Sequence, residues 1–386
     1  MTALPIPSKA LLAYSQQLSD LVQQQIKKSG GWISFAEFMH MVLYTPELGY
    51  YTGNLQKIAD GKQGGGDFVT APQISSLFSQ ALARQVAPIL IATKGDVLEL
   101  GAGTGKLASD LLLALDELDQ LPNHYFIMEV SSHLRSVQSG NLQKALPQSI
   151  FNKLQWLNEL PQQFTGCILA NEVLDAIPVR LLTKQGGKIM ERGVTFDNGF
   201  KWQDQDLMAD LIGDSFDIDA LPEGYLTEVC PESVGLINSL ADLLRHGLLL
   251  MIDYGFGAAE YYHPQRNQGT LMCHYQHYAH SDPFHYIGLQ DITAHVNFSA
   301  IAKAATSQGL VLEGYTNQAQ FLMNCGILDL LSQQTADATT YAAFAAGVQK
   351  LLSPSEMGEL FKVIAFSKGL EDNMLGFVKG DKTHTL

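Results

Sequence analysis

The sequence predicts an α/β protein built on a Rossmann-like, doubly wound, mostly parallel sheet, with an N-terminal helical extension and insertions. Short apolar runs of strand length alternate with segments of helical periodicity between about residues 96 and 253. A glycine-rich turn follows the first of these runs, and 46% of the 386 residues are hydrophobic, enough for a large core. Such alternation is typical of parallel strands with helices on both faces of the sheet.

Two helices are expected before the sheet. Apolar side chains recur at helical spacing over residues 11–22, and Gly30-Gly31 ends this helix. Ser34 with Glu37 three residues later forms a capping-box pattern, which predicts the start of a second helix. After a loop rich in glycine and tyrosine, another helix is expected from about residue 73 to 92.

The sheet elements follow from the same reading of apolar periodicity and turn residues. We expect strands at residues 96–100, 124–130, 153–157, 166–170, 248–253, 310–315 and 362–366, and helices at 106–118, 132–144, 234–245 and 298–308.

The chain organisation predicted from these elements is an extension followed by one sheet domain. Residues 1–92 form the helical extension with its glycine-rich lid loop, and residues 93–386 form the sheet domain. Inserted hairpins are expected at about residues 178–225, because polar and apolar residues alternate around turn signals there. Residues 255–291 are expected to be irregular, and residues from about 255 to 297 are expected to form a loop that covers the substrate.

Composition restricts the function. The net charge of −15 disfavours nucleic acid and favours a cationic partner, although many acidic proteins are acidic only for solubility. No apolar run is long enough to span a membrane, the first residues lack a signal-peptide pattern, and the four cysteines have no paired spacing. We therefore expect a cytoplasmic protein. The histidines of residues 274–285 lack a ligand spacing, so we expect no metal.

The most informative segment is Glu99-Leu100-Gly101-Ala102-Gly103-Thr104-Gly105, between a strand and a helix. A phosphate-binding P-loop has four residues between its first glycine and Gly-Lys, and Ser or Thr follows the lysine. Here only three residues separate Gly101 from Gly105, and Leu107 stands where the hydroxyl residue is needed. A dinucleotide loop has its third glycine one residue later, which disfavours a nicotinamide enzyme. The pattern E-x-G-x-G-x-G resembles motif I of the class I methyltransferases, whose turn holds S-adenosylmethionine.

A second acidic residue supports this interpretation. Glu129 ends the next expected strand, where its carboxylate can accept both ribose hydroxyls of a nucleoside. The predicted cofactor is S-adenosylmethionine, and its predicted ligands from these two segments are Glu99, Gly101, Ala102, Gly103, Gly105 and Glu129.

Further strings point to a narrower group. These are Gly66-Asp67-Phe68-Val69-Thr70-Ala71-Pro72, Asn171-Glu172-Val173-Leu174-Asp175-Ala176-Ile177-Pro178, Asp253-Tyr254-Gly255 and Asp291-Ile292-Thr293-Ala294-His295-Val296. Together with the glycine loop they resemble the MidA family of S-adenosylmethionine-dependent methyltransferases, over roughly residues 34–366.

The resemblance implies a class I methyltransferase fold and a protein substrate. Mitochondrial members of the family are protein arginine methyltransferases that assist assembly of respiratory complex I. The resemblance therefore implies methylation of an arginine in a partner protein, such as a complex I subunit. It also places Asp67, Phe68 and Thr70 in a lid over the cofactor and Asn171 beside the cofactor.

The chemistry of arginine methylation suggests catalytic residues. A guanidinium stays protonated and is a poor nucleophile, and carboxylates can hold it and localise its charge. Ligands of open α/β sheets sit beyond the carboxyl ends of the strands. We therefore predict Glu172 as a guanidinium holder, Asn171 as an orienting amide, Glu228 as a second carboxylate and His295 as a proton acceptor.

Two other functions stay open at this stage. One is methylation of a small molecule, and the other is a non-catalytic assembly factor that binds S-adenosylmethionine to stabilise a docking surface. The sequence does not specify the oligomeric state.

Overall fold

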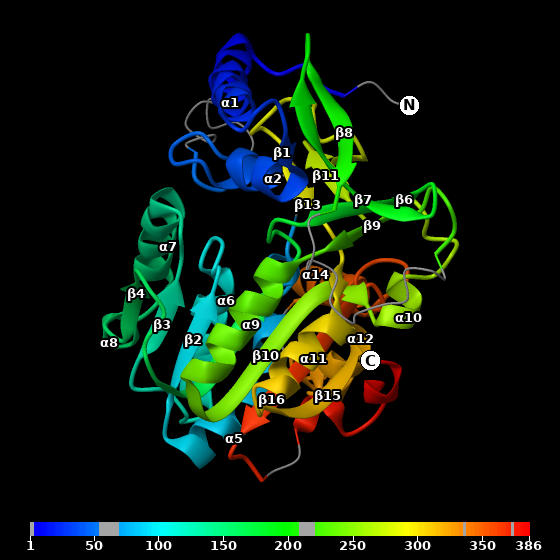
Figure 1. Cartoon of the computed structure of the whole chain (residues 1–386). Helices are drawn as coiled ribbons and strands as arrows, with labels where there is room; N and C mark the ends of the chain where they lie inside the picture. The colour runs from blue at the N-terminus through cyan, green and yellow to red at the C-terminus, as the bar shows by residue number, and fades with distance from the viewer. Residues whose placement is uncertain (1–3, 54–68, 208–220, 335–336, 372–373) are drawn as a thin grey trace. The chain divides into compact units, whose positions relative to one another are not determined.

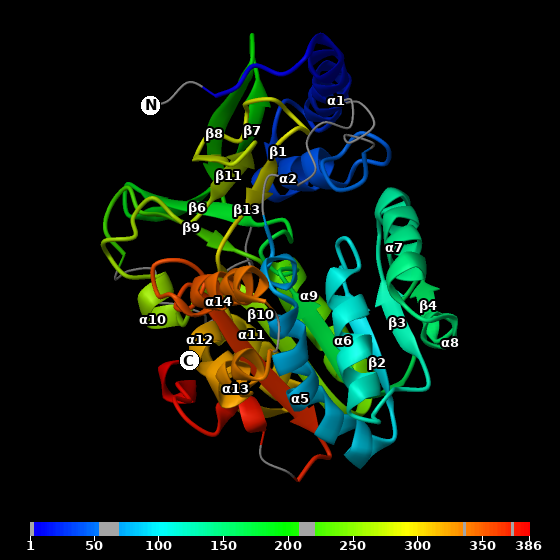
Figure 2. The same ribbon diagram turned by 180° about the vertical axis from the view of Figure 1, so that it is seen from behind.

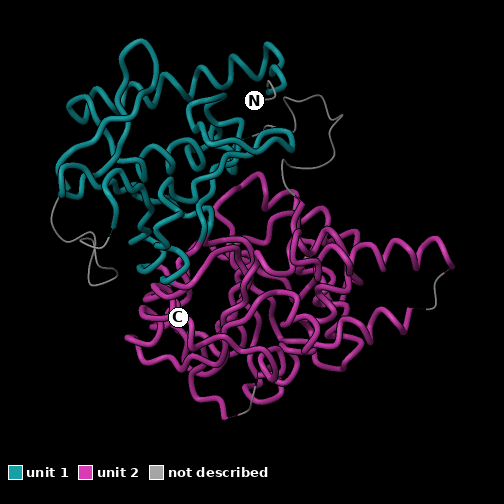
Figure 3. The backbone as a smooth tube through the Cα atoms, turned by 90° about the vertical axis from the view of Figure 1, so that its right-hand side faces the viewer, with its two compact units in different colours: residues 1–68, 175–235, 258–295 teal, residues 69–174, 236–257, 296–386 magenta. Residues whose placement is uncertain are grey.

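The computed structural model describes residues 4–53, 69–207, 221–334, 337–371 and 374–386. The chain divides into two compact units (Figure 3). Unit 1 comprises residues 1–68, 175–235 and 258–295, and unit 2 comprises residues 69–174, 236–257 and 296–386. Two of the three unit 1 segments are thus inserted into the sequence of unit 2.

Unit 2 is built on an eight-stranded sheet with the order β15-β16-β10-β5-β2-β3-β4, in which β14 also pairs with β10. Strands β10, β5, β2, β3 and β4 run parallel. Strand β16 is antiparallel to both of its neighbours, β10 and β15, so β15 runs in the same direction as the parallel strands. The strands are β2 (Asp96–Leu100), β3 (Tyr125–Met128), β4 (Leu154–Leu157), β5 (Phe164–Asn171), β10 (Leu244–Phe256), β14 (Val296–Asn297), β15 (Val311–Asn317) and β16 (Phe361–Lys368).

Helices cover both faces of this sheet. Figure 1 shows α9 (Pro231–Leu243) and α11 (Phe298–Ser307) in front of the sheet. Figure 2, from behind, shows α5 (Ser76–Thr93) and α6 (Lys106–Glu117) on the opposite face. Apolar side chains of α5 and α6 share one buried cluster with strand residues such as Val97 and Cys167. Burial of this cluster away from water fixes the layers.

The remaining helices of unit 2 lie before α5, between β3 and β5, or near the C-terminus. Sequence periodicity did not single out the C-terminal ones. They are α4 (Ala71–Ile74), α7 (Ser132–Ala145), α8 (Gln148–Phe151), α12 (Gln318–Asn324), α13 (Ile327–Ser332), α14 (Ala338–Leu352), and the 3₁₀ turns η1 (Leu375–Phe377) and η2 (Thr383–Thr385).

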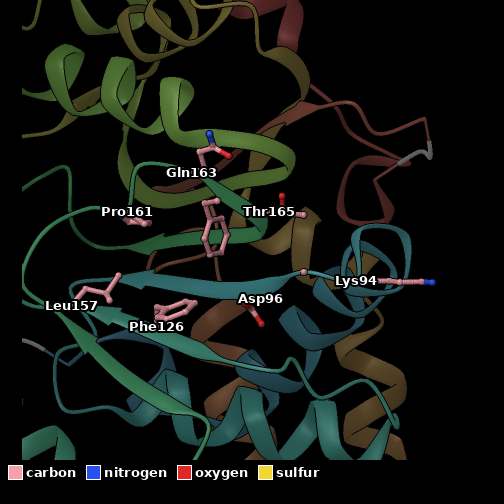
Figure 4. Close-up of a pocket in the computed structure, with 9 residues that line it drawn as sticks. Lys94, Asp96, Phe126, Leu157, Pro161, Gln163 and Thr165 are labelled. Carbon is pink, nitrogen blue, oxygen red and sulfur yellow. The ribbon is translucent and has the colours of Figure 1, made fainter.

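One crossover of the sheet lacks its helix. The parallel strands β4 and β5 are joined by residues 158–163, which form neither helix nor strand. Such crossovers usually contain a helix that covers the sheet. Here a pocket of about 320 Å³ adjoins the rings of Phe126 and Phe164, whose centroids lie 6.4 Å apart (Figure 4).

The described residues of unit 1 form two antiparallel sheets and the three helices α1, α2 and α10. The first sheet has the order β1-β7-β6-β9, with β8 paired to β7, and the second has the order β12-β11-β13. The elements are α1 (Lys9–Lys28), β1 (Ile33–Ser34), α2 (Phe35–Tyr44), β6 (Arg180–Gln185), β7 (Lys188–Phe196), β8 (Phe200–Asp206), β9 (Leu226–Val229), α10 (Ala258–Tyr261), β11 (Met272–Tyr275), β12 (Tyr278–His280) and β13 (Asp291–Thr293).

An aromatic core joins α2 to both sheets of unit 1. Phe38 packs edge-on against Phe200 of β8 and against Phe284, with ring centroids 5.8 and 5.5 Å apart. Trp202 lies 4.7 Å from Phe284. Unit 1 therefore has a hydrophobic core of its own, to which all three of its sequence segments contribute.

The two predicted N-terminal helices are confirmed, and Ser34 caps the second by accepting from the backbone of Glu37 at 3.1 Å. The predicted strands and helices of the sheet, and the hairpins β6–β7–β8, are also present.

Three expectations differ from the structure. The helix expected over residues 73–92 is two helices, α4 and α5, which are separated at Ser75. The stretch over residues 255–291 is not irregular, because it contains α10 and the sheet β12-β11-β13. The structure also groups residues 69–93 with unit 2, although we expected a boundary near residue 92.

Among the described residues, no helix combines the length and hydropathy needed to cross a bilayer.

Candidate functional site

The turn between β2 and α6 has the backbone of a ligand-binding loop. Gly101, Gly103 and Gly105 have φ angles of +62°, +53° and +82°, a region that residues with a Cβ rarely adopt. A Cβ built on Gly103 would meet no atom within 4 Å, so this glycine faces open space where a ligand can approach the backbone. The first turn of α6 supplies free N–H groups beside it.

Glu129 directly follows β3 and is held at both carboxylate oxygens. Its Oε1 accepts from the backbone N–H of Ser131 and its Oε2 from Nε2 of Gln138, each at 2.9 Å. The backbone of Val130 also hydrogen-bonds to this carboxylate, which has about four acceptor sites in all. Burial raises the pKa of Glu129, while these hydrogen bonds oppose the rise.

An open pocket of about 400 Å³ adjoins Glu129. A carboxylate at the edge of such a pocket suits a pair of neighbouring hydroxyls, as in a ribose. The lining residues are Met128, Glu129, Val130, Ser132, Arg135 and Asn158.

Glu99, predicted as a cofactor ligand, is almost fully buried at 2% exposure. The hydroxyl of Tyr125 donates to its Oε2 at 2.7 Å. Burial raises the pKa of Glu99 to about 7, with an opposing contribution from the Tyr125 hydrogen bond. Its carboxyl is therefore engaged inside the sheet domain. Ala102, in the same loop, is also buried.

Asn171 and Glu172 lie at the carboxyl end of β5, as predicted. Glu172 has a φ of +55°, an uncommon conformation for a residue that is not glycine. The side-chain amide of Asn171 donates to Glu172 Oε1 at 3.1 Å. Asn171 Oδ1 is buried and has no hydrogen-bond partner among the described residues. Strained backbone and an unsatisfied buried acceptor are both typical of functional sites.

The turn after β5 is fixed by Asp253 of the neighbouring strand β10. Asp253 is 1% exposed, and its Oδ2 accepts from the backbone N–H groups of Val173 and Leu174 at 3.1 and 2.9 Å. The N–H of Glu172 donates to the carbonyl of Ile252 at 2.9 Å. These contacts hold Glu172 in its strained conformation.

The two remaining predicted catalytic residues belong to unit 1. Glu228 on β9 is 1% exposed, and its carboxylate accepts from the backbone of Thr270 and Leu271 and from the Thr270 hydroxyl at 2.8 to 3.1 Å. This network gives Glu228 a structural role. The backbone N–H of His295 donates to Thr270 Oγ1 at 3.1 Å. The structure does not bring these residues together with Glu172 inside one unit.

Of the residues predicted to form a lid, Asp67 and Phe68 lie outside the described residues. Thr70 precedes α4, and its backbone N–H donates to the Gln73 side chain at 3.3 Å.

Sequence reasoning missed Gln138, which contacts both Glu129 and the glycine loop. A signal for it exists, because Leu134, Gln138 and Leu142 are spaced by four residues on α7. A polar residue in such an apolar row faces the interior of the protein.

The strand order, the glycine turn and an acidic residue, Glu129, placed after β3 to bind a ribose define a class I S-adenosylmethionine-dependent methyltransferase. The profile of the S-adenosyl-L-methionine-dependent methyltransferase family matches residues 81–316. The chain belongs to this family.

Curated relatives include proteins named mitochondrial protein arginine methyltransferase NDUFAF7. The zebrafish (Danio rerio) protein is 29% identical over 365 residues, which cover 86% of this chain and 82% of the relative. The rat (Rattus norvegicus) protein is 29% identical over 378 residues, covering 88% and 81%. The MidA resemblance is therefore confirmed.

A solved structure shows the same fold with the product of the cofactor. A protein from Burkholderia thailandensis, crystallised with S-adenosylhomocysteine, is 45% identical, covers all of both chains and superposes with a TM-score of 0.93. A native structure from the same organism superposes with a TM-score of 0.91. The predicted fold class and cofactor are confirmed, and the chain is a methyltransferase.

Proposed function

We propose that this methyltransferase transfers methyl groups to arginine side chains of a partner protein. The observation that carries the proposal is Glu172, whose carboxylate follows β5 on a strained, tightly held backbone. The names of the curated relatives support arginine as the acceptor, because those proteins align with most of this chain.

We assign the cofactor to the edge formed by the carboxyl ends of β2, β3 and β5. The positive φ angles of Gly101, Gly103 and Gly105 suit a turn that cradles the amino-acid end of S-adenosylmethionine. Glu129 borders the open pocket next to this turn, where its carboxylate would accept from the ribose hydroxyls. When bound, S-adenosylmethionine supplies an electrophilic methyl group on its sulfonium.

The acceptor side of the proposal rests on Glu172 and Asn171. A guanidinium presents planar N–H donors, which a carboxylate can accept in pairs. Glu172 would hold the guanidinium, and the free Oδ1 of Asn171 supplies a further acceptor next to it. Holding some of its nitrogens in this way localises the positive charge and leaves another nitrogen to attack.

The partner is proposed to be cationic where it docks. The net charge of −15 favours an arginine-bearing segment over an acidic one. A respiratory complex I subunit is the first acceptor to test, because of the MidA resemblance. We keep the cytoplasm as the proposed location, while the curated relatives are named as mitochondrial proteins.

The proposal is tested by incubating a protein extract with the chain and S-adenosylmethionine that carries a labelled methyl group. We expect label in methylarginine of a protein, detected by mass spectrometry. Glu172→Gln keeps the shape of the side chain and removes its charge. It should lower the transfer rate by at least about tenfold, or ~1.4 kcal/mol of barrier, with cofactor affinity nearly unchanged.

The matched control is Glu159→Gln, because Glu159 is an exposed glutamate of the same unit. It should retain full activity. Label found only in small molecules, or in a residue other than arginine, would overturn the proposed acceptor. Full activity of Glu172→Gln would remove Glu172 from the site.

A further inference from the structure

Helix α7 buries an amide where a helix normally buries an apolar side chain. Gln138 and Leu142 are its buried residues, and Gln138 has 0% exposure. Burying an amide without partners is unfavourable, so each polar atom at this position needs a hydrogen bond.

Gln138 has partners at both ends of its amide. Its Nε2 donates to the carbonyl of Gly103 at 3.0 Å and to Glu129 Oε2 at 2.9 Å. Its Oε1 accepts from the indole N–H of Trp156 on β4 at 2.9 Å. Because an indole nitrogen only donates, Trp156 turns the amide oxygen toward itself and the NH₂ group toward Gly103 and Glu129.

We propose that Gln138 is a positioning residue of the cofactor site, which sets the Glu129 carboxylate and the Gly103 peptide relative to each other. The proposal rests on the assignment of Glu129 and the glycine loop to S-adenosylmethionine. One amide group binds both, so the segment facing the ribose and the segment facing the amino-acid end are joined through a single side chain.

Two other residues of α7 also contact the glycine loop. The side-chain amide of Asn141 donates to the carbonyl of Thr104 at 3.0 Å. Leu142 lies 3.2 Å from the position of a Cβ on Gly105, so a larger residue there would collide with α7. Gln138 is the residue of α7 that reaches Glu129 as well as the loop.

The ionisation of Glu129 separates a positioning role from a merely structural one. Burial raises its pKa, whereas the hydrogen bonds from Ser131 and Gln138 and the nearby Arg135 lower it. The carboxyl of Glu99 faces it as a like charge. Removing the Gln138 amide should raise the pKa of Glu129 further. Cofactor binding needs the ionised carboxylate of Glu129. As the pH is lowered, the variant should therefore lose cofactor affinity at a higher pH than the wild type does.

The test is calorimetric titration of Gln138→Met with S-adenosylhomocysteine from acidic to alkaline pH. At neutral pH we expect affinity at least about tenfold weaker, or ~1.4 kcal/mol. We also expect the pH below which affinity falls to be displaced upward. Glu99 titrates in both proteins, so the displacement between the two curves is the readout. Gln143→Met is the matched control on the exposed face of α7 and should bind like the wild type.

Two further variants distinguish a failure of the Gln138 proposal from a failure of the assigned cofactor site. If Glu129→Ala binds S-adenosylhomocysteine as the wild type does, the ribose assignment is wrong, and the role of Gln138 falls with it. If Glu129→Ala binds weakly but Gln138→Met binds normally, or weakly without displacement of the pH curve, only the Gln138 proposal is overturned. Should Gln138→Met not fold, Trp156→Phe keeps a ring and removes the indole donor; it should displace the curve in the same direction.

Discussion

Replacing Glu172 by glycine should leave a more stable protein than replacing it by alanine. Both variants lose the same hydrogen bond with Asn171, so their difference reports the backbone alone. A residue with a Cβ pays roughly 1–2 kcal/mol in the left-handed region, where Glu172 has a φ of +55°. Glycine avoids this cost but loses roughly 0.5–1 kcal/mol more conformational entropy on folding. The glycine variant should therefore be more stable by about 0.5–1 kcal/mol.

The assay is urea denaturation of both variants, with comparison of their free energies of unfolding. Gly140 on α7 provides a control with the opposite expected order. Its φ is not positive and no atom lies within 4 Å of a Cβ there, so Gly140→Ala should stabilise the protein. If alanine at position 172 is as stable as glycine or more so, the strain argument is refuted. Methyl transfer should be lost in both position 172 variants.

Four other substitutions test the site. Gly103→Val introduces a strained, bulky residue at a φ of +53°, and Glu129→Ala removes about 1.5–3 kcal/mol of hydrogen bonding to a charged group; calorimetry should show weaker cofactor binding in both, and unchanged affinities would contradict the assigned site. Asp253→Ala strands two buried N–H donors, so we expect a loss of about 2 kcal/mol or more in urea denaturation and little methyl transfer; a stability equal to wild type would be inconsistent with this reading. Burial raises the pKa of Glu99 to about 7, so the native state holds a proton that the unfolded chain releases, and stability should fall as pH rises from about 4.5 through 7. Burial also raises the pKa of Glu129 and of Glu228, so Glu99→Gln should reduce that slope, and an equal slope in both proteins would assign it elsewhere.

Much of unit 2 was predictable because its signals are local. Buried strands such as β2 read as short apolar runs, and the turn after β2 needs glycine at three alternate positions. Those glycines and Glu129 lie within one βαβ segment, so adjacency in sequence became adjacency in space. The position of Glu172 at a strand end was predictable for the same reason.

Unit 1 was less predictable because its contacts are distant in sequence. The carboxylate of Glu228 accepts hydrogen bonds from Thr270 and Leu271, and no pattern near Glu228 in the sequence indicates those donors. Among the described residues the short strands β11, β12 and β13 pair with one another, and three or four residues carry too little periodicity to show a strand. Gln138 likewise depends on partners from three separate segments.

The hydrogen bond between Trp156 and Gln138 also gives the protein an optical reporter. The chain has three tryptophans, and Trp32 and Trp202 belong to unit 1, which leaves Trp156 as the indole of unit 2. Indole emission responds to the polarity and hydrogen bonding around its N–H group. The Gln138 amide contacts both Glu129 and this N–H, so it links the ribose-facing carboxylate to the indole. In a variant with Trp32→Phe and Trp202→Phe, where Trp156 is the remaining tryptophan, we therefore expect the indole emission to change when the cofactor site is occupied, without any attached dye.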